Sequence, residues 1–182
     1  MKRRIILIAL LVLLQGCAQT SGPGSSAAHE RRNAEALQDD RNIEHTAKQR
    51  IADKYRQNVQ VNVTSFNRFV LLTGQVPDES GKTGIERIVA GIDRVRGIAN
   101  ELRAGKSATP GTGYSDSGIS GDVRARLLAH KAHALDPIRV FTEEGVVYLL
   151  GIVSRAEADA ASEIASTTAG VRKVVRVFEY TD

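Results

Sequence analysis

Two segments of the chain repeat the same order of apolar and polar positions. Each has a β-rich run, a polar turn and a second β-rich run, over residues 61–76 and again over 138–153. The two copies stay in register at an offset of 77 residues. This pattern predicts a β-hairpin in each copy, with turns of moderate length at 65–68 and 142–145. An internal repeat of this size indicates two like units.

Segments with helical spacing flank each predicted hairpin. Apolar residues recur every three to four positions before it and again after it, which predicts two helices in each unit. Each unit then closes with a short strand that follows Gly97 or Gly170, and both glycines are predicted to cap the preceding helix. The offset between these glycines is 73, which predicts about four extra residues in the first unit, within 78–84. The common order is helix, strand, strand, helix, strand.

The start of the chain predicts a lipoprotein signal. Residues 2–4 form a positive region, and the apolar run 5–14 is too short to span a bilayer as a helix. Leu14-Gln15-Gly16-Cys17 fits a lipobox, in which the Cys17 thiol takes the lipid and cleavage precedes it. The alternative is a secretory signal with an incidental cysteine. Because Cys17 is the only cysteine, no intramolecular disulfide can form.

The repeated order resembles the BON domain. The resemblance rests on the hydrophobic-x-Gly-x-Val ending of the second strand, at Gly74 and Gly151, and on the glycine that starts the third. Two such units over about residues 40–182, behind a lipobox, resemble the dual-BON-domain lipoproteins of Gram-negative outer membranes. The resemblance implies an α+β fold of two tandem domains, each a three-stranded mixed sheet packed on two helices.

The pattern and the resemblance together predict five segments. We expect a signal peptide at 1–16, a lipidated cysteine and flexible tether at 17–39, a first domain at 40–104, a linker at 105–117 and a second domain at 118–182. Ala18 stands after the cysteine in place of an aspartate. Similarity to enterobacterial lipoprotein sorting therefore points to the outer membrane, with two or three acyl chains as a stable anchor.

The net charge gives little support to a nucleic-acid partner. The chain has 25 basic and 21 acidic residues, but removing residues 2–4 leaves 22 and 21, a net charge of +1. The charge is uneven along the chain: residues 41–105 carry a net charge of +4, and residues 115–182 carry −2. We therefore expect the first domain to be the more basic one.

The residues do not form a pattern that predicts catalysis. His130 and His133 have an i, i+3 spacing that a metal site could use, but solvated histidines at a helix end are the favoured interpretation. The pairs Asp39-Asp40 and Glu143-Glu144 are interpreted as helix-entry and turn residues. We expect no catalytic residue, metal, cofactor or small-molecule substrate. Gly151 is interpreted as a fold residue, and Gly151→Val is expected to cost about 1–3 kcal/mol.

One predicted helix, over 119–131, carries a candidate lipid-binding patch. Its buried face should hold Ile119, Val123, Leu127 and His130, which leaves a leucine between two cations on the outer side. Such a patch suits a lipid headgroup surface, and the alternative is a solvated face with one stray leucine. The predicted lipid-binding residues are Ser120, Arg124, Leu128 and Lys131.

The resemblance implies that the second domain binds anionic phospholipid through this helix. Related proteins can carry an aromatic residue just before Ile119, where this chain has Gly118. Electrostatic attraction is therefore expected to contribute more to lipid binding than insertion of a side chain into the membrane. The first-domain helix, with Lys48, Arg50, Lys54 and Arg56, is a rival lipid-binding face. We expect a non-catalytic lipoprotein on the periplasmic side of the outer membrane that binds anionic phospholipid and supports envelope integrity. The alternative is a protein-binding adaptor for outer-membrane protein assembly or peptidoglycan remodelling.

Overall fold

A computed structural model describes residues 30–56, 58–105, 115–130, 135 and 137–182. The first unit contains α2 (Ala34–Tyr55), β1 (Gln60–Phe66), β2 (Phe69–Val76), α3 (Glu79–Ala90), β3 (Gly97–Asn100) and β4 (Arg103–Ala104). The second contains α4 (Asp116–Ala129), β5 (Arg139–Glu143), β6 (Val146–Val153), α5 (Arg155–Ser166) and β7 (Lys173–Tyr180). The predicted α+β fold with tandem repeats is confirmed. The expected signal segment and Cys17 lie outside the described residues.

Each unit has a mixed sheet with the second hairpin strand at its centre. β2 pairs antiparallel with β1 and parallel with β3 and β4, and β6 pairs in the same way with β5 and β7. The third strand of the first unit is interrupted between β3 and β4, where the Asn100 side chain accepts a hydrogen bond from the Leu102 amide (3.3 Å). Both pieces still lie along β2.

The hairpin turns are tighter than predicted. Phe66 pairs with Phe69, and Glu143 pairs with Val146, so only two residues connect the strands in each hairpin. Those residues have positive φ angles, 51° and 66° in the first turn and 46° and 73° in the second. Positive φ at both positions defines a type I′ turn, whose twist matches that of the flanking strands.

The offset between the units beyond the hairpins is 76 residues, so the predicted value of 73 was wrong. Gly97 and Lys173 occupy equivalent positions, because each begins the third strand and pairs with the first residue of the central strand. The helices α3 and α5 both have 12 residues. The first unit therefore has a single extra residue, Pro77, instead of four.

The two glycines that suggested the wrong offset have different roles. Gly97 lies in β3, where the ring of Phe69 leaves no space for a Cβ. Gly170 has a φ of 82° in the turn before β7. The predicted helix caps were also wrong, since the C-cap residue is Gly91 for α3 and Thr167 for α5.

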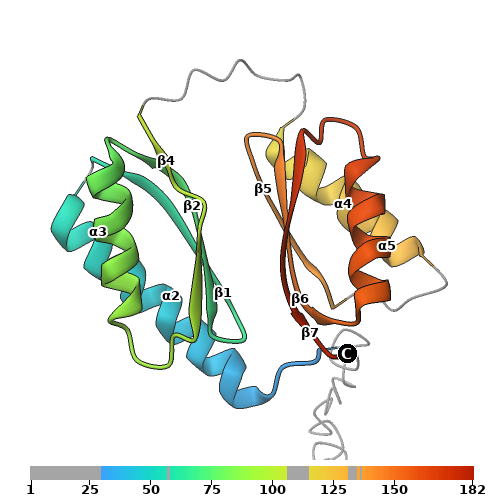
Figure 1. Ribbon diagram of the computed structural model, residues 1–182, viewed down its shortest axis with the longest axis horizontal. Coiled ribbons are helices and arrows are strands. Elements are labelled where there is room, and N and C mark those ends of the chain that lie inside the picture. Colours follow the sequence, from blue (N-terminus) through green and yellow to red (C-terminus); the bar gives the residue numbers. More distant parts are fainter. Residues whose placement is uncertain (1–29, 57, 106–114, 131–134, 136) are drawn as a thin grey trace, which may run out of the picture.

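The two sheets face each other between two layers of helices (Figure 1). The outer face of each sheet packs on its own helices, and the inner faces meet across one apolar cluster. The fully buried members of this interdomain cluster are Phe66, Leu71, Tyr148 and Leu150, each at most 5% exposed. Both faces of β2 and β6 are therefore covered, which explains the uninterrupted apolar runs in their sequences.

Candidate functional site

The helix α4 presents one side to solvent because its other side is anchored on the second sheet. Ser115 caps the helix by accepting a hydrogen bond from the Gly118 amide (3.1 Å). Ile119, Val123 and Leu127 are at most 2% exposed and belong to the core of the second domain. The start of α4 at Asp116 lies two residues before the expected domain boundary.

The structure brings together only part of the predicted lipid-binding patch. Arg124 and Leu128, one helical turn apart, are both exposed, and Leu128 is 62% exposed. Ser120 is half-buried and donates to the Thr142 hydroxyl (2.7 Å), so it faces β5 rather than the outer side. Lys131 lies outside the described residues. The described patch thus consists of a leucine and one arginine.

The next cation on α4, Arg126, has a structural role. Its guanidinium donates to the Ile164 carbonyl (2.8 Å) and to the hydroxyls of Thr167 and Thr168 (2.9 and 2.6 Å). These groups lie at the C-terminal end of α5, where a cation also stabilises the helix dipole. Arg126 therefore holds the two helices of the second domain together.

The rival basic face on α2 is partly engaged in local contacts. Lys48 lies 4.0 Å from the Glu44 carboxylate, and Arg50 donates to the Gly91 carbonyl (3.1 Å). Lys54 lies 5.5 Å from the ring centre of Tyr55. These exposed contacts are weak, so the cations remain accessible to an anionic surface.

The interdomain contact has a polar rim in which the first domain supplies donors and the second supplies carboxylates. Arg103 contacts Glu144 (2.6 Å), and Asn67 and Arg96 both contact Glu179 (2.8 and 3.1 Å). Further donors to Glu143 and Glu144 come from Asn62, Thr73 and Gln75. This polarity agrees with the net charges predicted for the two domains, and it favours contact between unlike domains.

The buried carboxylate of Asp40 organises the first hairpin. One oxygen accepts hydrogen bonds from the Ser65 hydroxyl and the Arg68 amide, and the other from Arg32 and the Asn67 amide, all at 2.7–2.9 Å. Asp116 likewise accepts from the two amides of the second turn (2.7 and 2.8 Å). The interpretation of Asp39-Asp40 as helix-entry residues was wrong, because α2 begins at Ala34.

The four residues Glu30–Asn33, which we call the strap, contact both domains just before α2. Arg31 donates to both oxygens of Glu157 (2.6 and 2.8 Å) and to the Ile152 carbonyl (2.8 Å) in the second domain. Arg32, at 6% exposure, bonds Asp40 and stacks 4.1 Å from the ring centre of Phe66 in the first. Sequence reasoning placed these residues in the tether, and no local pattern distinguishes them from it.

The Arg31–Glu157 pair predicts a dependence of stability on pH. The Arg31 guanidinium lowers the pKa of Glu157 to about 2, aided by hydrogen bonds from Ser154 and opposed by burial. The carboxylate should therefore stabilise the fold above about pH 4.5, and that contribution of about 1–3 kcal/mol should vanish as pH falls toward 2. Urea unfolding of wild type and Glu157→Gln from pH 7 to pH 2 checks this, because their difference should shrink only below pH 4.5. A difference that is constant with pH contradicts it.

The described residues include no group of three or more His, Cys, Asp or Glu side chains arranged to hold a metal ion. His130 caps the end of α4, and His133 lies outside the described residues, so the i, i+3 pair is not seen together.

Within the described ranges, no helix has both the length and the apolar character needed to cross a membrane.

These features define a tandem α+β protein whose two sheets pack face to face and whose helices face outwards. The sequence pattern of the BON domain matches residues 39–106 and 115–182, which together are more than half of the chain. The chain belongs to the BON domain family.

Three curated relatives resemble the chain. Outer membrane lipoprotein DolP of Haemophilus influenzae is 31% identical over 188 residues, 100% of this chain and 97% of that protein. The 21 kDa hemolysin of Actinobacillus pleuropneumoniae is 37% identical over 125 residues, 69% of this chain and 64% of that protein. Osmotically-inducible protein Y of Escherichia coli is 28% identical over 121 residues, 64% of this chain and 60% of that protein. Similarity to outer membrane lipoprotein DolP over the whole of this chain places the chain among the outer-membrane lipoproteins.

Proposed function

We propose that this lipoprotein is non-catalytic, faces the periplasm, binds anionic phospholipid through α4 and thereby supports envelope integrity. The observation that carries the proposal is the exposed side of α4, where Leu128 is the most exposed large apolar side chain among the described residues. The inner faces of both sheets are used by the interdomain contact, which leaves the helices as the broad outward surfaces. An apolar side chain beside a cation suits a headgroup layer.

Charge reversal on α4 tests this proposal directly. The double variant Arg124→Glu with Lys131→Glu should abolish cosedimentation of the unlipidated protein with anionic vesicles. Each cation near such a surface is worth about 1 kcal/mol, and the second domain has a net negative charge that would otherwise repel it. Circular dichroism should be unchanged, because Arg124 is exposed and its hydrogen bond to the Val140 carbonyl on β5 is long (3.5 Å).

The matched control reverses Lys48 and Arg50 on α2, which should weaken binding less. Both double variants are measured at low and at physiological salt, with vesicles of phosphatidylcholine alone and with added phosphatidylglycerol. If only the α2 variant loses binding, the lipid-binding face belongs to the first domain. If neither variant changes binding, lipid recognition by these helices is rejected and the protein-binding adaptor becomes the proposed function.

Anchoring is tested at Cys17, the proposed lipidation site. Cys17→Ala should leave a protein that is not lipidated and that is lost from the outer-membrane fraction, because a stable anchor requires more than one acyl chain. Immunoblots of membrane fractions washed in high salt show the result. Retention of the variant in the washed outer membrane would mean that another contact is the main anchor.

A further inference from the structure

The strap fixes the place where the proposed tether leaves the folded part of the chain. Arg31 binds beside the end of β6 and the first turn of α5, and Arg32 binds beside the β1–β2 turn. In Figure 1 the strap and the C-terminus lie at the same end of the molecule, whereas β4 and the start of α4, which flank the linker, lie at the opposite end. The proposed anchor therefore connects to one defined pole.

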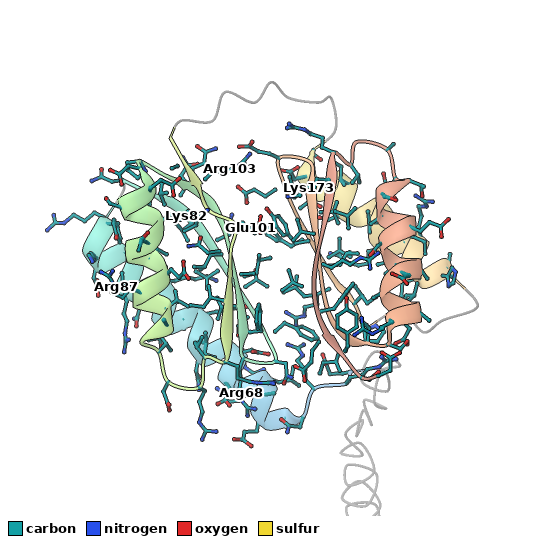
Figure 2. The ribbon with its side chains drawn as sticks, viewed as in Figure 1. Arg68, Lys82, Arg87, Glu101, Arg103 and Lys173 are labelled. Carbon is teal, nitrogen blue, oxygen red and sulfur yellow. The ribbon has the colours of Figure 1, made fainter. Side chains whose placement is uncertain are left out.

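We call this end the tether pole, and define it by Asn67–Arg68, Phe69, the strap and Glu179–Asp182. The Asn67 side chain donates to Glu179 (2.8 Å), and Asp40 joins the strap to the turn by accepting from Arg32 and from the amides of Asn67 and Arg68. Figure 2 shows Arg68 at this end and Lys173 at the other. Lys173 and Tyr180 are the two ends of β7. The length of this strand, roughly 23 Å, is therefore the separation of the two poles.

The tether pole gathers aromatic side chains at the surface. Phe69 and Tyr180 are each 39% exposed, and with Leu128 they are the large apolar side chains that are exposed in the described part of the chain. Phe69 and Phe178 line one cleft of about 470 Å³ between β3 and β7. The rings of Phe178 and Tyr180 lie 6.4 Å apart, and the Arg155 guanidinium lies 4.8 Å from the Tyr180 ring.

We infer that the tether pole is a second membrane-contacting surface, which sets Phe69 and Tyr180 against the phospholipid headgroup layer of the anchored protein. The inference rests on the lipid anchor proposed at Cys17, but it does not require lipid binding by α4. Amphipathic rings such as tyrosine, and arginines with apolar stems, are the side chains that suit the headgroup region.

The length of the tether supports this orientation. Twelve residues separate Cys17 from Glu30, and the flexible tether that the sequence predicts there would span about 20 Å on average and at most about 43 Å. Because Arg31 and Arg32 hold the strap against both domains, the tether pole is the part of the folded chain that lies next to the anchor along the sequence, and the far pole lies about 23 Å from it.

The contact at this pole should depend little on lipid charge. Arg31 and Arg96 are paired with Glu157 and Glu179, and Arg68 is paired with Asp39. The pole therefore offers aromatic surface and little net positive charge. It should touch zwitterionic bilayers as well as anionic ones, unlike the charge-dependent contact proposed for α4.

Fluorescent labels at the two ends of β7 test the inference. In the lipidated chain an engineered cysteine is the sole free thiol, so Thr181→Cys and Lys173→Cys can each be labelled alone; both positions are exposed. Lipidation is verified by mass, and the protein is placed in phosphatidylcholine vesicles that carry a headgroup quencher. The Thr181 label should be quenched at least about twofold more than the Lys173 label, given their separation. A third label at Ala125→Cys reports on α4.

Two further variants show which features produce the contrast. Phe69→Ser with Tyr180→Ser should reduce quenching at Thr181, and Arg31→Ala should reduce the difference between the two β7 labels by releasing the strap from the second domain. Equal quenching at the two ends of β7, or stronger quenching at Lys173, overturns the inference. Quenching at Ala125 without quenching at Thr181 also overturns it and supports α4 alone. The difference in quenching between the Thr181 and Lys173 labels is expected even if the unlipidated α4 variants show no change in vesicle binding.

Discussion

Replacing Asp40 with alanine is expected to lower the free energy of unfolding by about 3–5 kcal/mol, because the change leaves four donors without their acceptor. The buried Arg32 guanidinium then keeps Glu30 as its remaining carboxylate partner. The Asp40 side chain is nearly inaccessible and accepts four hydrogen bonds. Two of its donors are the amides of the type I′ turn, so the β1–β2 hairpin also loses the group that fixes its geometry. Urea unfolding followed by circular dichroism measures the loss.

The matched control for this change is Asp116→Ala in the second domain. Within the described part of the chain, Asp116 accepts from the two turn amides alone and is half-buried, so its removal should cost about 1–2 kcal/mol. Combining Asp40→Ala with Arg32→Ala should cost less than the sum of the two single changes, because each single change already removes the Arg32–Asp40 bond. Equal losses at Asp40 and Asp116, or additive losses at Asp40 and Arg32, would contradict this account.

A second large effect is expected from Gly74→Ala, at about 2–4 kcal/mol. Gly74 has a φ of 111°, a conformation that side chains other than glycine rarely adopt. A Cβ there would also overlap the carbonyl oxygen of Gln60 on the paired strand β1. The two strands must separate locally to admit it, since the obstacle is backbone and cannot rotate away.

Gly151 is the equivalent residue of the second hairpin and provides the control. Its φ is not in the positive range, and a Cβ would lie 3.2 Å from a methyl of Val153 and 3.4 Å from a side-chain carbon of Ile138. Gly151→Ala should therefore cost no more than about 1 kcal/mol, while the larger Gly151→Val stays at the predicted 1–3 kcal/mol. Thermal unfolding of the paired alanine variants compares them, and a larger loss at Gly151 would contradict the assignment of strain to Gly74.

The sequence predicted the parts of the fold that local periodicity encodes. Helical stripes such as Ile43, Ala47 and Ile51 do face the core, and the apolar run that begins at Phe69 does form a strand at the centre of its sheet. The doubled order was enough to recognise two like units. Single glycines did not predict the alignment of the two units, because Gly97 and Gly170 are not at equivalent positions.

Contacts between distant residues could not be predicted in this way. The Arg31–Glu157 bonds join residues 126 positions apart, and the Asn62–Glu143 bond joins residues 81 apart. Nothing in the local spacing of charged residues separates a buried Arg32 from a solvated one. The uninterrupted apolar runs in β2 and β6 were the one available signal that both faces of these strands would be covered. For the lipid-binding patch, the helix was predictable, but the rotation of Ser120 toward Thr142 was not.

The strap also determines how the molecule carries mechanical load. A pull applied at Glu30 enters both domains together, through Arg31 to the first turn of α5 and through Arg32 to the first hairpin. The force is divided between them, so it does not peel one domain from the other. Movement of the bilayer would thus displace the folded part as one body, with the interdomain contact protected from the tension.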